Sequence, residues 1–331
     1  MRAAMIEKPG SIVVKQIPDP TVGDRDVLIR VHASGICGTD IHIYKGEYLG
    51  SYPIIPGHEF SGVVEKVGAK TTRIKVGDRV CIEPNIACDN CPACLNNRQN
   101  FCENWQGVGV TMPGGMAELA VVPEKGVFDI GDLPFEYGAF VEPLSCVLHG
   151  VQKARFRLGD RILIIGAGPI GLLLSKTIQL QGSFEITQVD KNQSRLALAK
   201  ANGAAKTVSS FDELDVNGYD VVVDATGVPA LMEKTTDYAR KGGTILLFGV
   251  PPQGASIKLP AFTIFEHGLT ILSSYTSVRN SIQAVRLLRS GRIDVSSLVS
   301  HKLSLSEFER GINIIKNGEE GAMKVLIEPG R

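Results

Sequence analysis

The chain has 331 residues, of which 44% are hydrophobic and 21% charged, a composition typical of a folded protein with more than one core. Thirty-five basic residues balance thirty-five acidic ones, so the sequence lacks the basic surplus that nucleic-acid-binding domains carry. The longest apolar stretch, residues 162–174, is interrupted by glycines and a proline, and it is shorter than the roughly 20 residues that span a bilayer. Because the sequence turns polar soon after Met5, we expect no secretory signal and a cytoplasmic protein.

The first 147 residues are predicted to be mostly strand and turn. Short runs rich in β-branched residues are separated by turn-forming pairs such as Pro56-Gly57 and Gly77-Asp78. Many short strands with frequent turns are typical of a closed or sandwiched β structure. The predicted strands cover residues 2–6, 12–16, 26–33, 60–67, 79–82 and 117–122.

From about residue 148 the pattern changes to strands that alternate with helices. This alternation predicts βαβ units around a doubly wound parallel (Rossmann) sheet, so we assign the α/β class. The predicted strand–helix pairs are 162–165 with 170–181, 185–189 with 194–202, and 220–223 with 230–240, followed by a strand over 244–248. Helical stretches over 280–290 and 305–317 and a strand over 323–327 close the chain.

A GxGxxG motif directly follows the first strand of this region and opens its first helix. The first glycine allows a tight turn, the second lets the backbone approach a pyrophosphate, and the third lets helix and strand pack closely. Asp190 closes the next strand, where a carboxylate would accept from a ribose 2′-hydroxyl and repel a 2′-phosphate. NAD is therefore favoured, although the nearby Arg195 leaves NADP open. The predicted cofactor-binding residues are Gly166, Gly168, Pro169, Ile170, Gly171, Asp190 and Arg195.

Four of the seven cysteines cluster within fifteen residues of a polar, turn-rich stretch. The odd total argues against a disulfide framework. Short spacing lets four sulfurs surround zinc tetrahedrally and leaves no open coordination position, so this metal is predicted to be structural. An iron–sulfur cluster is the alternative, because its motifs also use tight cysteine spacing. The predicted ligands are Cys88, Cys91, Cys94 and Cys102.

Metal-capable side chains also occur in three separate segments, at Cys37, at His58-Glu59 and at Glu142. A catalytic zinc needs a few protein ligands of mixed type and one open position for water or substrate. Cysteine, histidine and one or two carboxylates meet that requirement, but sequence spacing alone does not bring them together. Taken singly, these residues have ordinary interpretations: a buried thiol, a polar turn pair and a carboxylate at a helix start.

The motifs of the whole chain, in their order, resemble the zinc-containing medium-chain dehydrogenase/reductase (alcohol dehydrogenase) superfamily. The resemblance is carried by "CGTDIH" at 37–42, "GHEFSGVV" at 57–64, "VGDRV" at 76–80, the four-cysteine segment, "GAGPIG" at 166–171 and "DATG" at 224–227. Within the superfamily, "CGTDIHIY" and "GAFVEPLSCVLHG" are most similar to the polyol (sorbitol-type) and threonine dehydrogenase branch.

This resemblance implies a domain organisation. Residues 1–147 would form a GroES-like β-barrel catalytic domain with a structural zinc lobe at 84–104. Residues 148–274 would form the NAD-binding Rossmann domain, and residues 275–331 would return to the catalytic domain. It also implies two zinc ions per chain and a homotetramer or homodimer. The balanced charge and the short apolar stretches predict no nucleic-acid or membrane partner.

The resemblance further implies roles for individual residues. Cys37 and His58 would bind the catalytic zinc, and Glu59 would be the third protein ligand where liver-type alcohol dehydrogenases carry a cysteine. Glu142 would be a fourth ligand or would hold the zinc-bound water. Thr39 and His42 would relay the proton to bulk water, and Asp40 would orient His58. The implied reaction is NAD-linked oxidation of a secondary hydroxyl of a polyol to a ketose, with hydride transfer to the nicotinamide.

The substrate is less well specified than the chemistry. Where sorbitol dehydrogenases commonly carry an arginine that contacts the polyol, the stretch 273–277 offers hydroxyls and an aromatic ring, so glucitol itself is in doubt. Tyr48 and Tyr275 are candidate pocket residues. L-Threonine 3-dehydrogenase is the nearest alternative, although it would need a carboxylate-binding cation.

Two further alternatives belong to other classes. A binding protein that has lost catalysis is opposed by the intact set of Cys37, His58 and Glu59. A zinc-ribbon nucleic-acid binder would need a basic face, and Arg98 is the only basic residue within the cysteine lobe.

Overall fold

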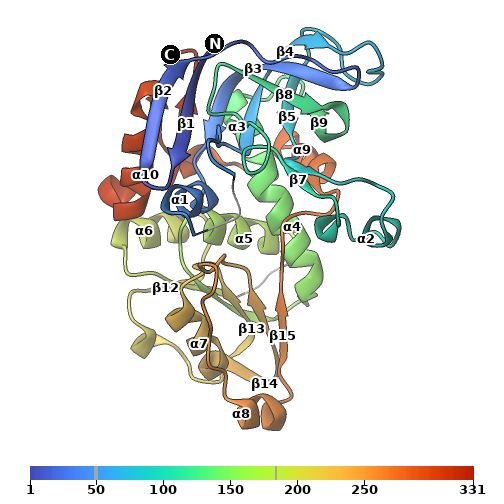
Figure 1. Ribbon diagram of the computed structural model, residues 1–331. Helices are drawn as coiled ribbons and strands as arrows, with labels where there is room; N and C mark the ends of the chain where they lie inside the picture. Colours follow the sequence, from blue (N-terminus) through green and yellow to red (C-terminus); the bar gives the residue numbers. More distant parts are fainter. Residues whose placement is uncertain (48–50, 183–184) are drawn as a thin grey trace. The chain divides into compact units, whose positions relative to one another are not determined.

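The computed structural model describes residues 1–47, 51–182 and 185–331, which form two compact units. One unit comprises Met1–Ser145 together with Thr276–Arg331, and the other comprises Cys146–Tyr275. The chain therefore leaves the first unit once and returns to it (Figure 1). The first crossing falls inside the helix α4 (Val141–Ala154). Among the described helices, none combines the length and apolar character that a bilayer crossing requires.

Within its described residues, the second unit is built on a parallel sheet of six strands in the order β12-β11-β10-β13-β14-β15. The strand order reverses between β10 and β13, which is the arrangement of doubly wound α/β folds. The strands are β10 (Arg161–Ile165), β11 (Glu185–Val189), β12 (Lys206–Val208), β13 (Tyr219–Asp224), β14 (Ala239–Leu247) and β15 (Thr270–Ser273), and the helices are α5 (Pro169–Gln179), α6 (Gln193–Ala201), α7 (Pro229–Tyr238) and α8 (Ala261–His267).

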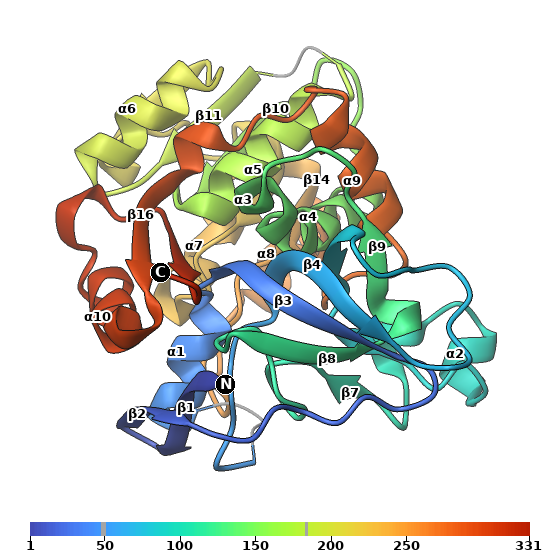
Figure 2. The same ribbon diagram turned by 90° about the horizontal axis from the view of Figure 1, so that it is seen from above.

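The central strands of this sheet are buried because their sequences are nearly continuous apolar runs. Ile162, Ile164 and Val222 are fully buried, as expected for parallel strands whose two faces are both covered by helices. In both ribbon views α5 and α6 lie side by side (Figure 1, Figure 2). The GxGxxG segment comes at the end of β10, and so at the point where the strand order reverses.

One predicted boundary in this unit is wrong. The helix expected over 230–240 ends at Tyr238, and β14 begins at Ala239, earlier than the predicted 244–248. The register of β13 against β14 shifts between Tyr219 and Val221, Arg240 pairs with Asp220, and Gly242 takes a positive φ of 75°. The extra residues of β14 thus form an irregular strand start that has no alternating apolar pattern.

In the described part of the first unit, seven strands form one sheet in the order β16-β17-β3-β4-β5-β9, with β8 paired to β3. Figure 2 shows β3, β4 and β8 as neighbouring strands. The strands of this unit are β1 (Arg2–Lys8), β2 (Ser11–Gln16), β3 (Asp26–Gly35), β4 (Glu59–Val67), β5 (Arg79–Ile82), β6 (Asn85–Ile86), β7 (Gln106–Gly107), β8 (Leu119–Pro123), β9 (Val127–Asp129), β16 (Val299–Ser304) and β17 (Lys324–Glu328). Its helices besides α4 are α1 (Gly38–Lys45), α2 (Pro92–Leu95), α3 (Phe135–Ala139), α9 (Ser281–Arg289) and α10 (Phe308–Asn317).

The C-terminal segment completes this sheet. Strand β17 pairs antiparallel with β3, so that Leu326 lies opposite Gly35, and the Arg2 guanidinium donates to the Pro329 carbonyl at 3.0 Å. A buried apolar cluster joins the two chain ends, since Ala3 and Ala4 pack in the same core as Phe308. The register places the end of β3, the start of β4 and the start of β17 next to one another.

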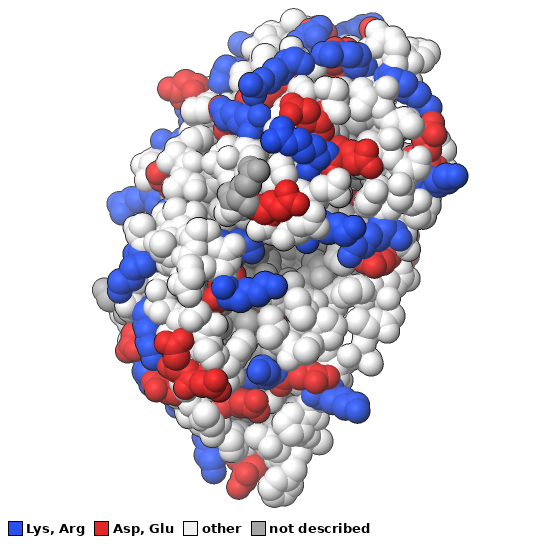
Figure 3. Space-filling model, turned by 90° about the vertical axis from the view of Figure 1, so that its left-hand side faces the viewer, with Lys and Arg blue, Asp and Glu red and all other residues white. Residues whose placement is uncertain are grey.

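Surface charges show no segregation by sign on the face drawn in Figure 3. Lysine and arginine side chains are interspersed there with aspartate and glutamate side chains, in keeping with the equal numbers of basic and acidic residues.

Candidate active site and metal centres

Three metal-capable side chains meet where β3 ends and β4 begins. Cys37 is the N-cap of α1, just beyond β3, and His58 and Glu59 stand at the start of β4. One ligand atom from each of these three residues lies within 4.8 Å of the other two. The antiparallel pairing of β3 with β4, with Gly35 opposite Glu59, explains why segments distant in sequence converge here.

The donors present fit a divalent transition metal. His58 is buried, and its Nδ1 atom lacks a hydrogen-bond partner among the described residues. Burial lowers the pKa of His58, but the charges of Asp40 and Cys37 raise it, and the net pKa is well above the ordinary value. The negative charges around His58 therefore favour a cation at this position. A thiolate, an imidazole and a carboxylate together are a ligand set that zinc accepts while keeping a position open.

Asp40 links the segments that carry these ligands. It is fully buried on α1, and its carboxylate accepts from the Cys37 backbone amide at 2.8 Å and from the Gly57 amide at 3.3 Å. Its Oδ1 lies 3.6 Å from Nδ1 of His58, which is too long for a strong hydrogen bond. Asp40 thus fixes the backbone on both sides of the site.

Thr39 and His42, the predicted relay residues, both lie on α1. The Cys37 thiol is 3.8 Å from the Thr39 hydroxyl, and Nδ1 of His42 is 3.0 Å from a Glu47 carboxylate oxygen. Among the described contacts, none joins Thr39 directly to His42. A proton path between them would need a bridging water or hydroxyl.

The sequence interpretation missed Lys324, a buried lysine at the start of β17. Its ammonium forms an ion pair with Oε2 of Glu59, 265 positions away in sequence. Burial lowers the pKa of Lys324, but the charges of Glu59, Cys37 and Glu142 raise it, and the net pKa lies above its ordinary value. No sequence motif marks this residue, because strand pairing alone brings it to the site.

Glu142 is buried near the start of α4. The group of three converging donors among the described residues does not include it, although its charge contributes to the raised pKa of Lys324. Its carboxylate thus belongs to the electrostatic surroundings of the site, while Cys37, His58 and Glu59 share its centre.

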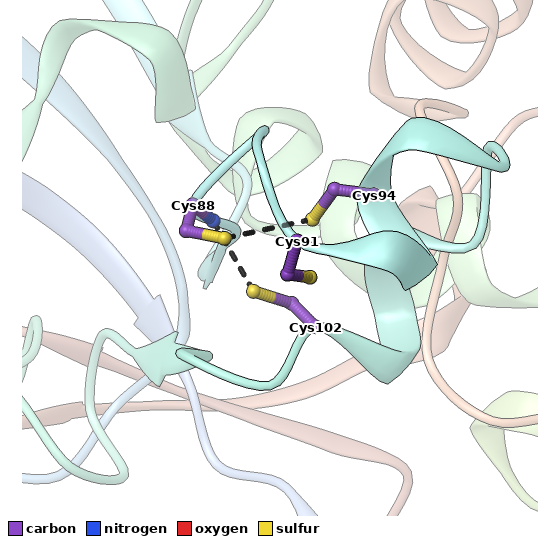
Figure 4. A group of neighbouring side chains, drawn as sticks. All are labelled: Cys88, Cys91, Cys94 and Cys102. Carbon is purple, nitrogen blue, oxygen red and sulfur yellow. Dashed lines mark hydrogen bonds between the residues drawn. The ribbon is translucent and has the colours of Figure 1, made fainter.

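The four clustered cysteines form a second donor group. Their sulfur atoms lie within 4.8 Å of one another and point toward a common centre (Figure 4). Backbone hydrogen bonding from Asn90 is the main cause that lowers the pKa of Cys88, to about 6, whereas burial raises that of Cys94 to about 12. Four sulfurs at these distances, with amides aimed at some of them, fit a tetrahedral zinc without an open position.

Each glycine of the glycine-rich loop is required for a different physical reason. Gly166 takes a φ of +105°, which L residues rarely adopt. A Cβ at Gly171 would lie 2.1 Å from the Gly166 carbonyl oxygen, whereas a Cβ at Gly168 would meet nothing within 4 Å. Pro169 and Ile170 begin α5 behind this open space. The loop can therefore admit a phosphate group at the helix N-terminus.

Asp190 lies directly after β11, at the edge of this loop. One carboxylate oxygen accepts from the Ala167 amide at 2.8 Å and the other accepts from the Asn192 amide at 2.9 Å. Arg195 lies in the first turn of α6, where its amide donates to the Asn192 side chain at 3.2 Å. Asp190 thus braces the glycine loop, a structural task that the sequence pattern did not reveal.

Of the two tyrosines predicted to line the substrate pocket, the structure describes one. Tyr48 lies outside the described residues. Tyr275 is 38% exposed and ends the second unit.

A Rossmann sheet with a phosphate-admitting loop, combined with a mixed-donor metal site on a separate β unit, defines the class of zinc-containing, nicotinamide-dependent alcohol dehydrogenases. Comparison with protein families agrees. Residues 23–132 match the alcohol dehydrogenase GroES-like domain, and residues 169–290 match the zinc-binding dehydrogenase domain.

Several individual proteins are similar over nearly their whole length. D-Arabinitol dehydrogenase 1 of Uromyces fabae is 33% identical, covering 99% of this chain and 97% of its own. D-Altritol 5-dehydrogenase of Agrobacterium fabrum is 37% identical, with coverages of 93% and 94%. L-Threonine 3-dehydrogenase of Bacillus subtilis is 32% identical, with 98% of both chains covered.

Solved structures extend the comparison. A putative zinc-binding dehydrogenase from Sinorhizobium meliloti, bound to NADP, has a TM-score of 0.94 at 34% identity, with 99% of both chains covered. An alcohol dehydrogenase from Escherichia coli complexed with NADH has a TM-score of 0.92 at 26% identity, again with 99% of both chains covered. The chain therefore belongs to the zinc-dependent medium-chain dehydrogenase family and is polyol-dehydrogenase-like. It is an NAD(P)-dependent alcohol or polyol dehydrogenase.

Proposed function

We propose that this protein oxidises a secondary hydroxyl of a polyol to a ketose, with NAD as hydride acceptor and two zinc ions per chain. The observation that carries the proposal is the convergence of Cys37, His58 and Glu59 within 4.8 Å of one another. Three protein donors leave the fourth coordination position of a zinc ion to a substrate hydroxyl, whereas the four sulfurs of the lobe leave none.

A zinc ion held by these three residues would act as a Lewis acid that makes the substrate hydroxyl easier to deprotonate. The residues around it have tasks of their own. Asp40 holds the backbone of Cys37 and Gly57 in place, and the Thr39 hydroxyl, beside the Cys37 sulfur, is placed to accept the substrate proton as it passes its own proton on. His42, 18% exposed at its side chain, can pass a proton to solvent once a water or substrate hydroxyl bridges it to Thr39. Glu142 adds negative charge at the edge of the site.

NAD bound at the glycine loop would supply the hydride acceptor. The open space at Gly168 and the N-terminus of α5 would receive the pyrophosphate. The carboxylate of Asp190 would disfavour a 2′-phosphate, while Arg195, one turn away, would favour it. We place the balance with NAD because the carboxylate sits directly at the loop.

Threonine is the second candidate substrate, since several of the similar proteins, at 31% to 33% identity, are L-threonine 3-dehydrogenases. A threonine site would need a cation for the substrate carboxylate. The higher identity of 37% to a D-altritol 5-dehydrogenase favours the sugar alcohols.

Steady-state reduction of NAD across pentitols, hexitols, inositols and L-threonine tests the proposed substrate class. We expect turnover on at least one alditol with a kcat/KM well above that on L-threonine. Preference for L-threonine would overturn the polyol assignment while leaving the dehydrogenase chemistry intact.

A homodimer or homotetramer is supported by the edge of the parallel sheet. Phe262 and Phe265 on α8 are 72% and 81% exposed, their rings are 6.4 Å apart, and β15 is the edge strand of the described sheet. An exposed aromatic pair beside an unpaired edge is characteristic of an interface between subunits. Light scattering should give two or four times the chain mass of 35.6 kDa; the mass of one chain would contradict this.

A further inference from the structure

Lys324 is an unusual residue for its position. It is only 5% exposed, and lysine is rarely buried unless it is paired. Its ammonium contacts Oε2 of Glu59 and also donates to the Ile36 carbonyl at 3.3 Å. These contacts hold the ammonium between the end of β3 and the start of β4.

A glycine at position 35 leaves room for this contact. A Cβ at Gly35 would lie 2.3 Å from Oε2 of Glu59 and 3.3 Å from Cδ of Lys324. Because the φ of Gly35 is not in the left-handed region, the glycine is needed for space rather than for backbone conformation. The sheet is thus shaped around the contact between Lys324 and Glu59.

Charge at the site also points to Lys324. A metal-bound Cys37 is a thiolate, and the carboxyl groups of Asp40, Glu59 and Glu142 are buried in the same part of the unit. A divalent metal offsets two negative charges, and the ammonium of Lys324, paired with Glu59, offsets one more. Unbalanced charge in a protein interior is costly.

We propose that Lys324 is a positioning residue for the catalytic metal, one that fixes the Glu59 carboxylate by holding Oε2 and offsets part of the negative charge of the site. The inference rests on the proposed function, in that Glu59 serves as a metal ligand. Lys324 would contact neither the metal nor the substrate, and it would act through Glu59.

Removal of Lys324 can change zinc affinity in either direction, and the direction distinguishes two roles for the ammonium group. If Lys324 only repelled the metal, its removal would tighten zinc binding. If it positions Glu59, its removal weakens zinc binding, since partners that orient metal ligands typically contribute about 10- to 100-fold in affinity.

The test measures zinc affinity of the full chain by competition with a chromophoric chelator, together with the absorption spectrum of the Co²⁺-substituted protein. We expect Lys324→Met to weaken zinc at the mixed-donor site about 10- to 100-fold and to change the Co²⁺ ligand-field bands. Zinc at the four-cysteine lobe should stay bound. Lys324→Gln keeps a hydrogen-bond donor on a side chain that is one bond shorter, and it should weaken zinc binding less than the methionine variant does.

Lys302→Met is the matched control. Lys302 lies on the adjacent strand β16 and pairs with Glu136 and Glu328 at the surface, so its loss removes a lysine ion pair from the same sheet without touching the site. A double-mutant cycle adds specificity. In a Glu59→Gln background, Lys324→Met should change zinc affinity much less than it does in the wild type.

Zinc affinity that is unchanged or increased in both Lys324 variants, with an unaltered Co²⁺ spectrum, would overturn the proposal. Should the methionine variant fail to fold, the glutamine variant carries the same comparison. A wild-type protein that binds zinc only at the four-cysteine lobe would instead contradict the proposed function itself, so the two failures are distinguishable.

Discussion

The two donor groups of this protein are assembled in opposite ways. The four cysteines of the lobe lie within fifteen residues, and local turns around α2 bring their sulfurs together. The mixed-donor site takes Cys37 from the end of β3 and His58 and Glu59 from the start of β4, and it adds Lys324 from the last strand. Local spacing therefore specifies the lobe, whereas the register of a whole sheet specifies the mixed-donor site.

Because the two sites are assembled differently, we expect substitutions in them to affect different properties of the protein. A closed four-sulfur site contributes folding free energy and leaves no position for chemistry. A site built across strands depends on the sheet being complete, and its open position is where chemistry occurs. Substitutions in the lobe should affect stability first, and substitutions in the mixed-donor site should affect turnover first.

Cys37→Ser should have the largest effect on turnover. Loss of the sulfur ligand removes Lewis-acid assistance worth several kcal/mol, so kcat should fall about 1000-fold or more. The dissociation constant for NAD should change less than about twofold, because the glycine loop belongs to the other unit. Steady-state kinetics and cofactor fluorescence titration measure the two quantities. Near-normal turnover would remove Cys37 from the mechanism.

Cys94→Ser should show the converse pattern. Cys94 is 5% exposed within the lobe, and loss of a structural zinc should lower the melting temperature by at least about 10 °C. Calorimetry gives this shift, and metal analysis should find that one zinc is lost. The protein that remains folded should keep the Co²⁺ spectrum of the mixed-donor site. Loss of that Co²⁺ spectrum with no change in melting temperature would contradict a structural role for the four-cysteine lobe.

Gly35→Ala tests the assembly of the mixed-donor site from strands. The new methyl group would collide with the Glu59 carboxylate, and a displacement of about 1 Å at a catalytic group can cost about 100-fold. We expect kcat/KM to fall about 10- to 100-fold in a protein that still folds. Gly330→Ala is the control, because a Cβ there meets nothing within 4 Å. Equal activity in the two variants would argue against the crowding at Gly35.

Asp190→Asn should have the smallest of these effects. The amide keeps an acceptor for the Ala167 or Asn192 backbone amide but removes the negative charge that disfavours a 2′-phosphate. The ratio of kcat/KM for NAD to that for NADP should fall about tenfold, which is about 1.4 kcal/mol. An unchanged ratio would mean that Asp190 serves the glycine loop alone and that Arg195 or its neighbours set the preference.

Much of the fold follows from local patterns. The strand–helix alternation after residue 148 predicted the parallel sheet, because buried parallel strands are apolar throughout and are punctuated by glycines. The pattern failed at the start of β14, where Arg240 and Gly242 belong to an irregular strand that shows neither strand nor helix periodicity.

The site was predictable where its residues belong to recognisable local motifs. Cys37, His58 and Glu59 carry metal-binding chemistry that is visible in sequence, and the family resemblance grouped them. Lys324 was not identified, because a lysine on a closing strand has no chemical signature until pairing with β3 places it against Glu59. The bracing hydrogen bonds of Asp190 were equally hidden, since they depend on the close approach of the loop to the end of β11.

An anomalous-difference map at the zinc absorption edge, from a crystal of the native enzyme, shows whether Cys37, His58 and Glu59 bind one zinc ion. We expect two peaks per chain, one at the four cysteines and one bonded to the Cys37 sulfur, a His58 ring nitrogen and a Glu59 oxygen at about 2.0–2.3 Å. A single peak at the cysteine lobe, from protein that retains full activity, would contradict this expectation.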